Sequence, residues 1–120
     1  MSSIILIDDD SLVRMSIKVV LEQAGHHVRE APDGYVGLKL FQREPADVVI
    51  TDLVMPEKEG IETMMELKKH DSKVKILVMS GKVSYLDFAR QLGADRILAK
   101  PFHQDQLLLM VEELAGKSDS

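Results

Sequence analysis

Short aliphatic runs recur along the chain at fairly even intervals, with longer segments of mixed polarity between them. Four of these runs contain no polar residue, and a weaker fifth surrounds Val28. The four runs are Ile4–Ile7, Val48–Ile50, Ile76–Met79 and Ile97–Ala99. Apolar runs without alternation are typical of strands that are buried on both faces, as in parallel sheets. The pattern therefore predicts five strands, most of them fully buried.

The segments between the runs carry apolar residues three or four positions apart, which is the spacing of an amphipathic helix. Five such stripes alternate with the strands: Val13, Ile17, Val20, Leu21 and Ala24; Leu38 and Phe41; Ile61, Met64 and Met65; Leu86, Ala89 and Leu92; Leu107, Val111 and Leu114. Gly25 and Gly93 follow the first and fourth stripes, where glycine commonly ends a helix. Five strand–helix units predict an α/β fold with a doubly wound, open parallel sheet.

Composition and charge are those of one soluble domain. The chain has 120 residues, of which 45% are hydrophobic and 29% charged, and it contains no cysteine. The net charge of −5 argues against direct nucleic-acid binding, which favours a basic face. No apolar run approaches the ~20 residues of a membrane span. We therefore expect a cytoplasmic protein without nucleic-acid or membrane partners.

Four of the predicted strands end in residues that can bind ions or react. Counting the segment around Val28 as the second strand, Asp8 and Asp9 follow the first predicted strand, and Asp52 follows the third. Ser80 follows the fourth predicted strand, and Lys100 follows the fifth. In open α/β sheets, ligands bind at the carboxyl ends of the strands, near the point where the strand order reverses. We therefore expect these five side chains to lie along one edge of the sheet.

The charges of this group favour a metal-assisted phosphoryl reaction. Three carboxylates placed together repel one another, and one tends to stay protonated. A divalent ion and the ammonium of Lys100 would balance the three negative charges. Carboxylate oxygens suit Mg²⁺, and a metal, a lysine and a hydroxyl can neutralise a transferring phosphoryl group. A carboxylate can itself be the nucleophile and form an aspartyl-phosphate.

Four motifs in order resemble those of response-regulator receiver domains, the phospho-accepting half of two-component signalling. They are Asp8-Asp9, "DLVMPEKEG" from Asp52, "MSG" around Ser80, and "GADRILAKPF" from Gly93. The resemblance runs from about residue 4 to 114. It implies a flavodoxin-like (βα)5 sheet of strand order 2-1-3-4-5. It also implies a single receiver domain over residues 1–120, with 115–120 as a tail or the start of a linker.

The resemblance assigns a role to each residue of the group. Asp52 would accept a phosphoryl group from a sensor histidine kinase or a histidine phosphotransfer protein. Asp9, Asp52 and the backbone carbonyl of Val54 would ligate Mg²⁺, while Asp8 would hold the ion through water. Such a chain catalyses only its own phosphorylation and dephosphorylation, and is not otherwise an enzyme.

Two further residues complete the resemblance. Lys100 would pair with a phosphoryl oxygen, and the bond from Lys100 to Pro101 is expected to be cis. Ser80 would turn its hydroxyl onto the phosphoryl group and move the loop after the fourth strand. An output domain or effector would then read the face made by the fourth helix, fifth strand and fifth helix.

Four positions depart from the family pattern. Ile97 stands where an aromatic switch residue is usual, so we expect signalling to be read mainly from the loop after Ser80 and the following helix. Val54 and Lys82 replace residues that commonly place the hydrolytic water, which predicts a long phosphoryl lifetime. Gly81 replaces a commoner alanine, so this loop is expected to be mobile.

Two expectations concern the apolar surplus of the chain. The run Leu107–Val111 has more apolar residues than one helix stripe needs, so Leu109 or Met110 should be partly exposed. Such a patch could be a docking or dimer surface, including a phosphorylation-dependent dimer, or a loosely buried surplus. The methionines, among them Met64, Met65 and Met79, are expected to fill the core.

Other interpretations of the same residues remain. Asp10 and Ser11 are expected only to cap the first helix. The segment "IILIDDDSL" also resembles haloacid-dehalogenase-type phosphatases, with Asp8 as nucleophile and Asp10 as acid. Leu12 does not fit that pattern, and the chain lacks a final acidic pair at a strand end. A pseudo-receiver without phosphorylation is disfavoured because all five chemical positions are intact.

Overall fold

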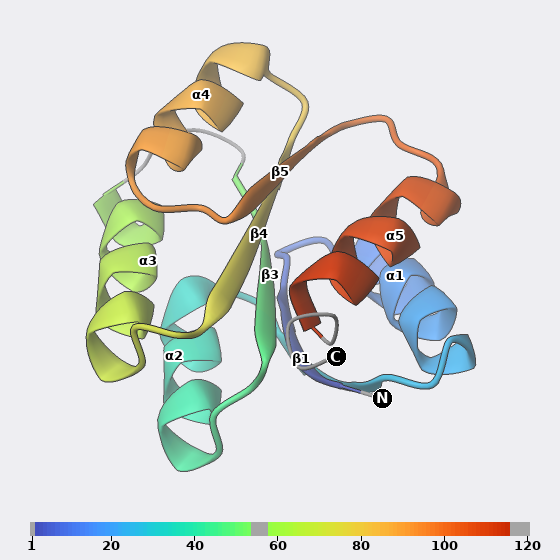
Figure 1. The fold of residues 1–120 in the computed structure, drawn as a ribbon, viewed down its shortest axis with the longest axis horizontal. Coiled ribbons are helices and arrows are strands. Elements are labelled where there is room, and N and C mark those ends of the chain that lie inside the picture. Colours follow the sequence, from blue (N-terminus) through green and yellow to red (C-terminus); the bar gives the residue numbers. More distant parts are fainter. Residues whose placement is uncertain (1, 54–57, 116–120) are drawn as a thin grey trace.

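Strands and helices alternate along the chain in the computed structural model, which describes residues 2–53 and 58–115 (Figure 1). The strands are β1 (Ser3–Ile7), β2 (His27–Ala31), β3 (Val48–Asp52), β4 (Lys75–Ser80) and β5 (Arg96–Ala99). The helices are α1 (Ser11–Gln23), α2 (Gly34–Arg43), α3 (Lys58–His70), α4 (Val83–Gln91) and α5 (Gln104–Ala115). None of the helices within these described ranges is long and apolar enough to cross a membrane.

The five strands form one parallel sheet in the order β2-β1-β3-β4-β5. This result confirms the predicted doubly wound fold and its strand order. The order reverses between β1 and β3, which are hydrogen-bonded neighbours with Ile7 opposite Thr51. Because every pairing is parallel, the carboxyl ends of all five strands lie at the same edge of the sheet.

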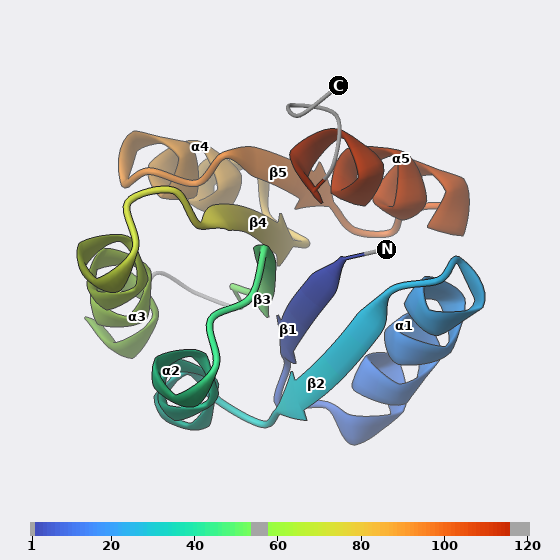
Figure 2. The same ribbon diagram turned by 60° about the horizontal axis from the view of Figure 1, so that its bottom comes forward.

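Both faces of the sheet are covered by helices, as Figures 1 and 2 show: α1 and α5 pack on one face, and α2, α3 and α4 on the other. Successive side chains of a strand point to opposite faces. In β1, Ile5 and Ile7 belong to the core on the α2, α3 and α4 side, whereas Ile4 and Leu6 belong to the core beneath α1 and α5. The positions from Ile4 to Ile7 therefore all need an apolar residue, which explains the unbroken run.

Local signals in the sequence set the ends of several helices. The Asp10 carboxylate accepts hydrogen bonds from the backbone N–H groups of Leu12 and Val13, at 3.0 and 3.3 Å. Asp10 therefore caps α1, as expected. Gly25 and Gly93 adopt φ angles of 96° and 111° just after α1 and α4. An L-residue rarely adopts this conformation, so glycine ends these helices at the predicted positions.

The apolar stripes are confirmed in most positions, but Met65 and Ala24 are exposed. Ala24 lies just beyond the end of α1. Met64 and Met79 are buried in the two cores, but Met65 is 59% exposed. The expectation that Met65 fills the core is wrong, because α3 needs only one narrow stripe to cover its share of the sheet. In α5, Leu109 is 61% exposed and Met110 is partly buried, as the apolar surplus there predicted.

Candidate functional site

Three carboxylates meet at the carboxyl edge of the sheet. Asp8 and Asp9 directly follow β1, and Asp52 is the last residue of β3. Each offers one oxygen atom, and these atoms lie within 4.8 Å of one another. Since β1 and β3 are neighbours in the sheet, their ends bring together residues that are more than forty positions apart in the sequence. The predicted convergence of the three acids is present in the structure.

Asp8 is the most deeply buried of the three acids. Its side chain is buried, and one carboxylate oxygen, Oδ1, accepts a hydrogen bond from the backbone N–H of Asp10 at 2.9 Å. The other oxygen, Oδ2, is buried and has no hydrogen-bond partner among the described residues. Burial raises the pKa of Asp8, and the charges of Asp52 and Asp9 add to the rise, while the Asp10 N–H and Lys100 oppose it. A bound cation would give this oxygen a positively charged partner.

Lys100 and Ser80 lie at the same edge of the sheet. The Nζ atom of Lys100 is 2.8 Å from Oδ1 of Asp52, whose side chain is only 9% exposed. The backbone N–H of Lys100 donates to the carbonyl oxygen of Ser80, and the Lys100–Pro101 peptide bond is cis, as expected. Ser80 is buried, and its hydroxyl oxygen accepts a hydrogen bond from the backbone N–H of Lys82 at 3.2 Å. The edge therefore combines carboxylates, an ammonium group and a hydroxyl.

The remaining predicted positions lie around this edge rather than within it. Lys82 directly precedes α4, and its Nζ atom stands 5.9 Å from the centroid of the Tyr85 ring. Gly81 is exposed, with open space where a Cβ would be. Ile97 is partly buried against the core on the α2, α3 and α4 side. Val54 lies outside the described residues.

The structure also shows that Arg14, which the sequence patterns did not single out, contacts the main chain of Asp8. Arg14 of α1 donates a hydrogen bond to the backbone carbonyl of Asp8, and its Nε atom is 3.1 Å from the Glu30 carboxylate of β2. Lys18 reaches the second oxygen of Glu30 at 3.2 Å. Burial tends to raise the pKa of Glu30, but the hydrogen bonds and charges of Lys18 and Arg14 hold it below its usual value. Arg14 thus ties α1 and β2 to the main chain that carries Asp8.

A shallow groove of about 470 Å³ opens beside Lys100. It is lined by Val13, Ser16 and Ile17 of α1 and by the segment from Lys100 to Phe102. Two large apolar side chains of α1, Leu12 and Met15, are 72% and 58% exposed. The sequence contained a signal for this surface, since both residues lie outside the predicted apolar stripe of α1.

Replacement of Asp8 by asparagine should stabilise the protein in the absence of divalent ions. The raised pKa means that ionised Asp8 destabilises the fold at neutral pH, and that wild-type stability increases as the pH falls through this pKa. Asparagine keeps the acceptor for the Asp10 N–H and removes the charge. We expect a gain of about 1–3 kcal/mol in the free energy of unfolding, measured by urea denaturation with a chelator at pH 7. The exposed acid Asp87, changed to asparagine, is the control, and an equal gain in both variants would contradict the account.

Removal of Arg14 should destabilise the protein through Glu30 and the Asp8 carbonyl. Arg14→Met leaves both acceptors without this donor, so we expect a loss of about 1–2 kcal/mol, moderated by partial exposure of the pair. A double-mutant cycle with Glu30→Gln measures the coupling. Because the Glu30 pKa is lowered, this coupling should be present at neutral pH and be lost only as the pH falls through that lowered pKa, which lies below the ordinary value of 4.5. Additive effects at neutral pH would rule out the coupling.

The chain matches a known protein family over nearly its whole length. Residues 4–112 match the response regulator receiver domain family. Among related proteins, the cell cycle response regulator CtrA of Brucella ovis is 32% identical over 117 residues, which cover 96% of this chain and 50% of that protein. The chain therefore spans about half the length of the curated relatives it matches.

Solved structures agree with the family match. A response regulator receiver domain protein from Clostridium thermocellum superposes with a TM-score of 0.88 at 28% identity, covering 99% of this chain and 98% of that one. The chemotaxis protein CheY4 of Vibrio cholerae gives a TM-score of 0.85 at 26% identity, covering 95% and 98%. These similarities exclude the phosphatase interpretation of the first motif and support the resemblance on which the site roles rest. The chain belongs to the response regulator receiver domains of two-component signalling.

Proposed function

We propose that Asp52 is the phosphoacceptor and that its phosphorylation switches the protein between two signalling states. The observation that carries this proposal is the position of Asp52 between the carboxylate cluster and the ammonium of Lys100, 2.8 Å away. An oxygen of Asp52 attacks the phosphorus of a phosphohistidine. The new P–O bond forms as the P–N bond breaks, and the donor imidazole keeps the electron pair of that bond. Residues 1–120 act in this reaction as one cytoplasmic receiver domain, which is not otherwise an enzyme.

The donor atoms around Asp52 fit a resident Mg²⁺ ion. Asp9 and Asp52 would hold the ion directly and Asp8 through water, with the Val54 carbonyl as a further ligand. The buried Asp8 oxygen, which has no partner in the part of the chain that the structure describes, supports this assignment, since oxygen-rich sites suit hard cations. When bound, Mg²⁺ supplies positive charge that stabilises the transferring phosphoryl group. Lys100 adds to this stabilisation by leaving Asp52 for an oxygen of the phosphoryl group.

The switch would begin at Ser80. Its hydroxyl oxygen now accepts the Lys82 N–H, and donation of the hydroxyl to a phosphoryl oxygen would reorient this group. Because Gly81 and Lys82 lead directly into α4, the reorientation would move the start of that helix. Val83 at this start is 69% exposed, and Leu109 of α5 is 61% exposed. We propose that a partner, an output domain or a second copy reads the surface of α4, β5 and α5.

The phosphoryl donor would dock on the surface beside α1. The groove is lined by residues of α1 and by Lys100, whose Nζ atom is 2.8 Å from Asp52. Leu12 and Met15 of the same helix are exposed apolar side chains. A histidine kinase or phosphotransfer protein that covers this surface would bring its phosphohistidine to the carboxyl edge and exclude water there. The same helix contains Arg14, which holds the main chain of Asp8 in place during docking.

Phosphorylation can be tested directly by intact-mass spectrometry after incubation with a small acyl phosphate. We expect a single phosphoryl adduct on the wild-type protein when Mg²⁺ is present, and none when it is chelated. The variant Asp52→Asn should form no adduct, whereas the control Asp10→Asn, which changes only the cap of α1, should form it. An adduct that persists in Asp52→Asn would move the acceptor to another carboxylate and contradict the proposal.

A further inference from the structure

A second surface feature lies away from the carboxylate cluster, between α2 and α3. These helices run side by side on the same face of the sheet (Figures 1 and 2). A groove of about 680 Å³ lies between them, within the size range of ligand-binding clefts. At one end the helices approach so closely that a Cβ atom on Gly34 would lie 2.3 Å from Oγ1 of Thr63. The absence of a side chain at Gly34 therefore allows the two walls of the groove to pack directly together.

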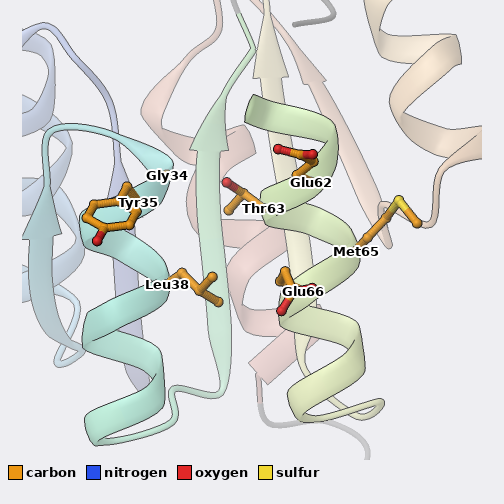
Figure 3. A pocket seen from close by; sticks show the side chains of 7 residues that line it. All are labelled: Gly34, Tyr35, Leu38, Glu62, Thr63, Met65 and Glu66. Atoms are coloured by element: carbon orange, nitrogen blue, oxygen red, sulfur yellow. The ribbon is translucent and has the colours of Figure 1, made fainter. Parts of the chain in front are cut away.

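The groove has an apolar floor and an apolar edge on α2, whereas the Met65 side chain extends from α3 on the side away from α2 (Figure 3). Leu38 of α2 is partly buried and points between the helices, as Figure 3 shows. Tyr35 and Met65, on the two helices, are 63% and 59% exposed. Met65 belongs to the predicted core stripe of α3, but the structure leaves it at the surface. Exposed tyrosine offers a partner a large apolar area with few rotatable bonds. Exposed methionine offers a flexible thioether chain that adapts its shape to the partner.

Two carboxylates line the α3 side of the groove. Glu62 and Glu66 are one helical turn apart, a spacing at which like charges repel. Among the described residues, neither has an ion pair or a hydrogen bond. The basic residue of α2 near the groove, Lys39, stands instead over the Tyr35 ring at 4.6 Å. The next turn of α3 differs, since Lys68 pairs with Asp95 at 2.9 Å.

We propose that this groove binds a basic amphipathic helix of a partner protein. Apolar side chains of that helix pack on Leu38 and Tyr35, and its lysine or arginine residues pair with Glu62 and Glu66. Relief of the repulsion between the two carboxylates adds to the binding. Anionic partners such as nucleic acids or acidic lipids are disfavoured by the same two charges and by the net charge of −5.

A second copy of this chain fits the groove poorly. The densest basic stretch, from Lys68 to Lys75, combines an already paired lysine with few apolar residues on one face. The proposed binding does not require phosphorylation, because all lining residues belong to α2 and α3. It is therefore independent of the chemistry proposed for Asp52.

The test uses a fluorescent synthetic helix of leucine and lysine in an amphipathic pattern, with a peptide of leucine and glutamate as control. Fluorescence anisotropy with the full chain measures affinity. The variant Glu62→Gln/Glu66→Gln should weaken binding of the lysine peptide about tenfold, the effect expected when two charge pairs are lost. The matched variant Glu22→Gln/Asp87→Asn removes the same charge from exposed residues of α1 and α4, and should change the affinity less than about twofold.

Amide chemical shifts identify where the peptide binds. We expect the changes to concentrate at residues 34–38 and 62–66, both in the wild type and in Asp52→Asn. Tyr35→Ala, which removes an exposed side chain at the edge of the groove, should also weaken binding while leaving the fold intact. Equal weakening by both charge variants, or shifts centred on other helices, would overturn the proposal. Self-association of the protein that the Glu62→Gln/Glu66→Gln variant abolishes would assign the groove to a second copy instead.

Discussion

Repulsion among Asp8, Asp9 and Asp52 is the interaction around which the carboxyl edge of this receiver domain is organised. One oxygen of each lies within 4.8 Å of the others, and one oxygen of Asp8 is buried without a partner among the described residues. Such a cluster is unfavourable unless positive charge is brought to it. Lys100 forms an ion pair with Asp52, and Arg14 donates a hydrogen bond to the backbone carbonyl of Asp8. The remaining charge is what a divalent cation would supply.

Apolar burial in the sheet offsets the repulsion among the three acids. The cluster sits at the ends of β1 and β3, neighbouring strands whose side chains are buried on both faces. Their apolar contacts stabilise the fold enough to hold three acids at one edge. The same edge contains Ser80, the last residue of β4, which directly precedes the residues leading into α4.

Much of this structure follows from local patterns in the sequence. Unbroken apolar runs predicted the strands, and three- and four-residue spacing predicted the helices, because both patterns reflect which side chains meet the sheet. The strand-end rule predicted that Asp8, Asp52 and Lys100 would converge. Asp10 was correctly identified as a cap, since its hydrogen bonds reach only two and three residues along the chain.

Features that depend on packing between distant elements could not be predicted in this way. The contact of Arg14 with Glu30 joins α1 to β2, and only the relative position of helix and sheet brings the two together. Met65 was misplaced because spacing alone does not give the width of a buried stripe. The groove between α2 and α3 likewise arises from how closely Gly34 lets the helices approach.

The pKa of the Asp8 carboxyl group, followed by NMR with and without Mg²⁺, tests the central claim most directly. Burial and neighbouring carboxylates should place this pKa above the ordinary value of 3.8 in the metal-free protein. Saturating Mg²⁺ should lower it, because the ion stabilises the charged form. An Asp8 pKa that is ordinary without the ion and unchanged by it would contradict the account of a strained carboxylate cluster that awaits a cation.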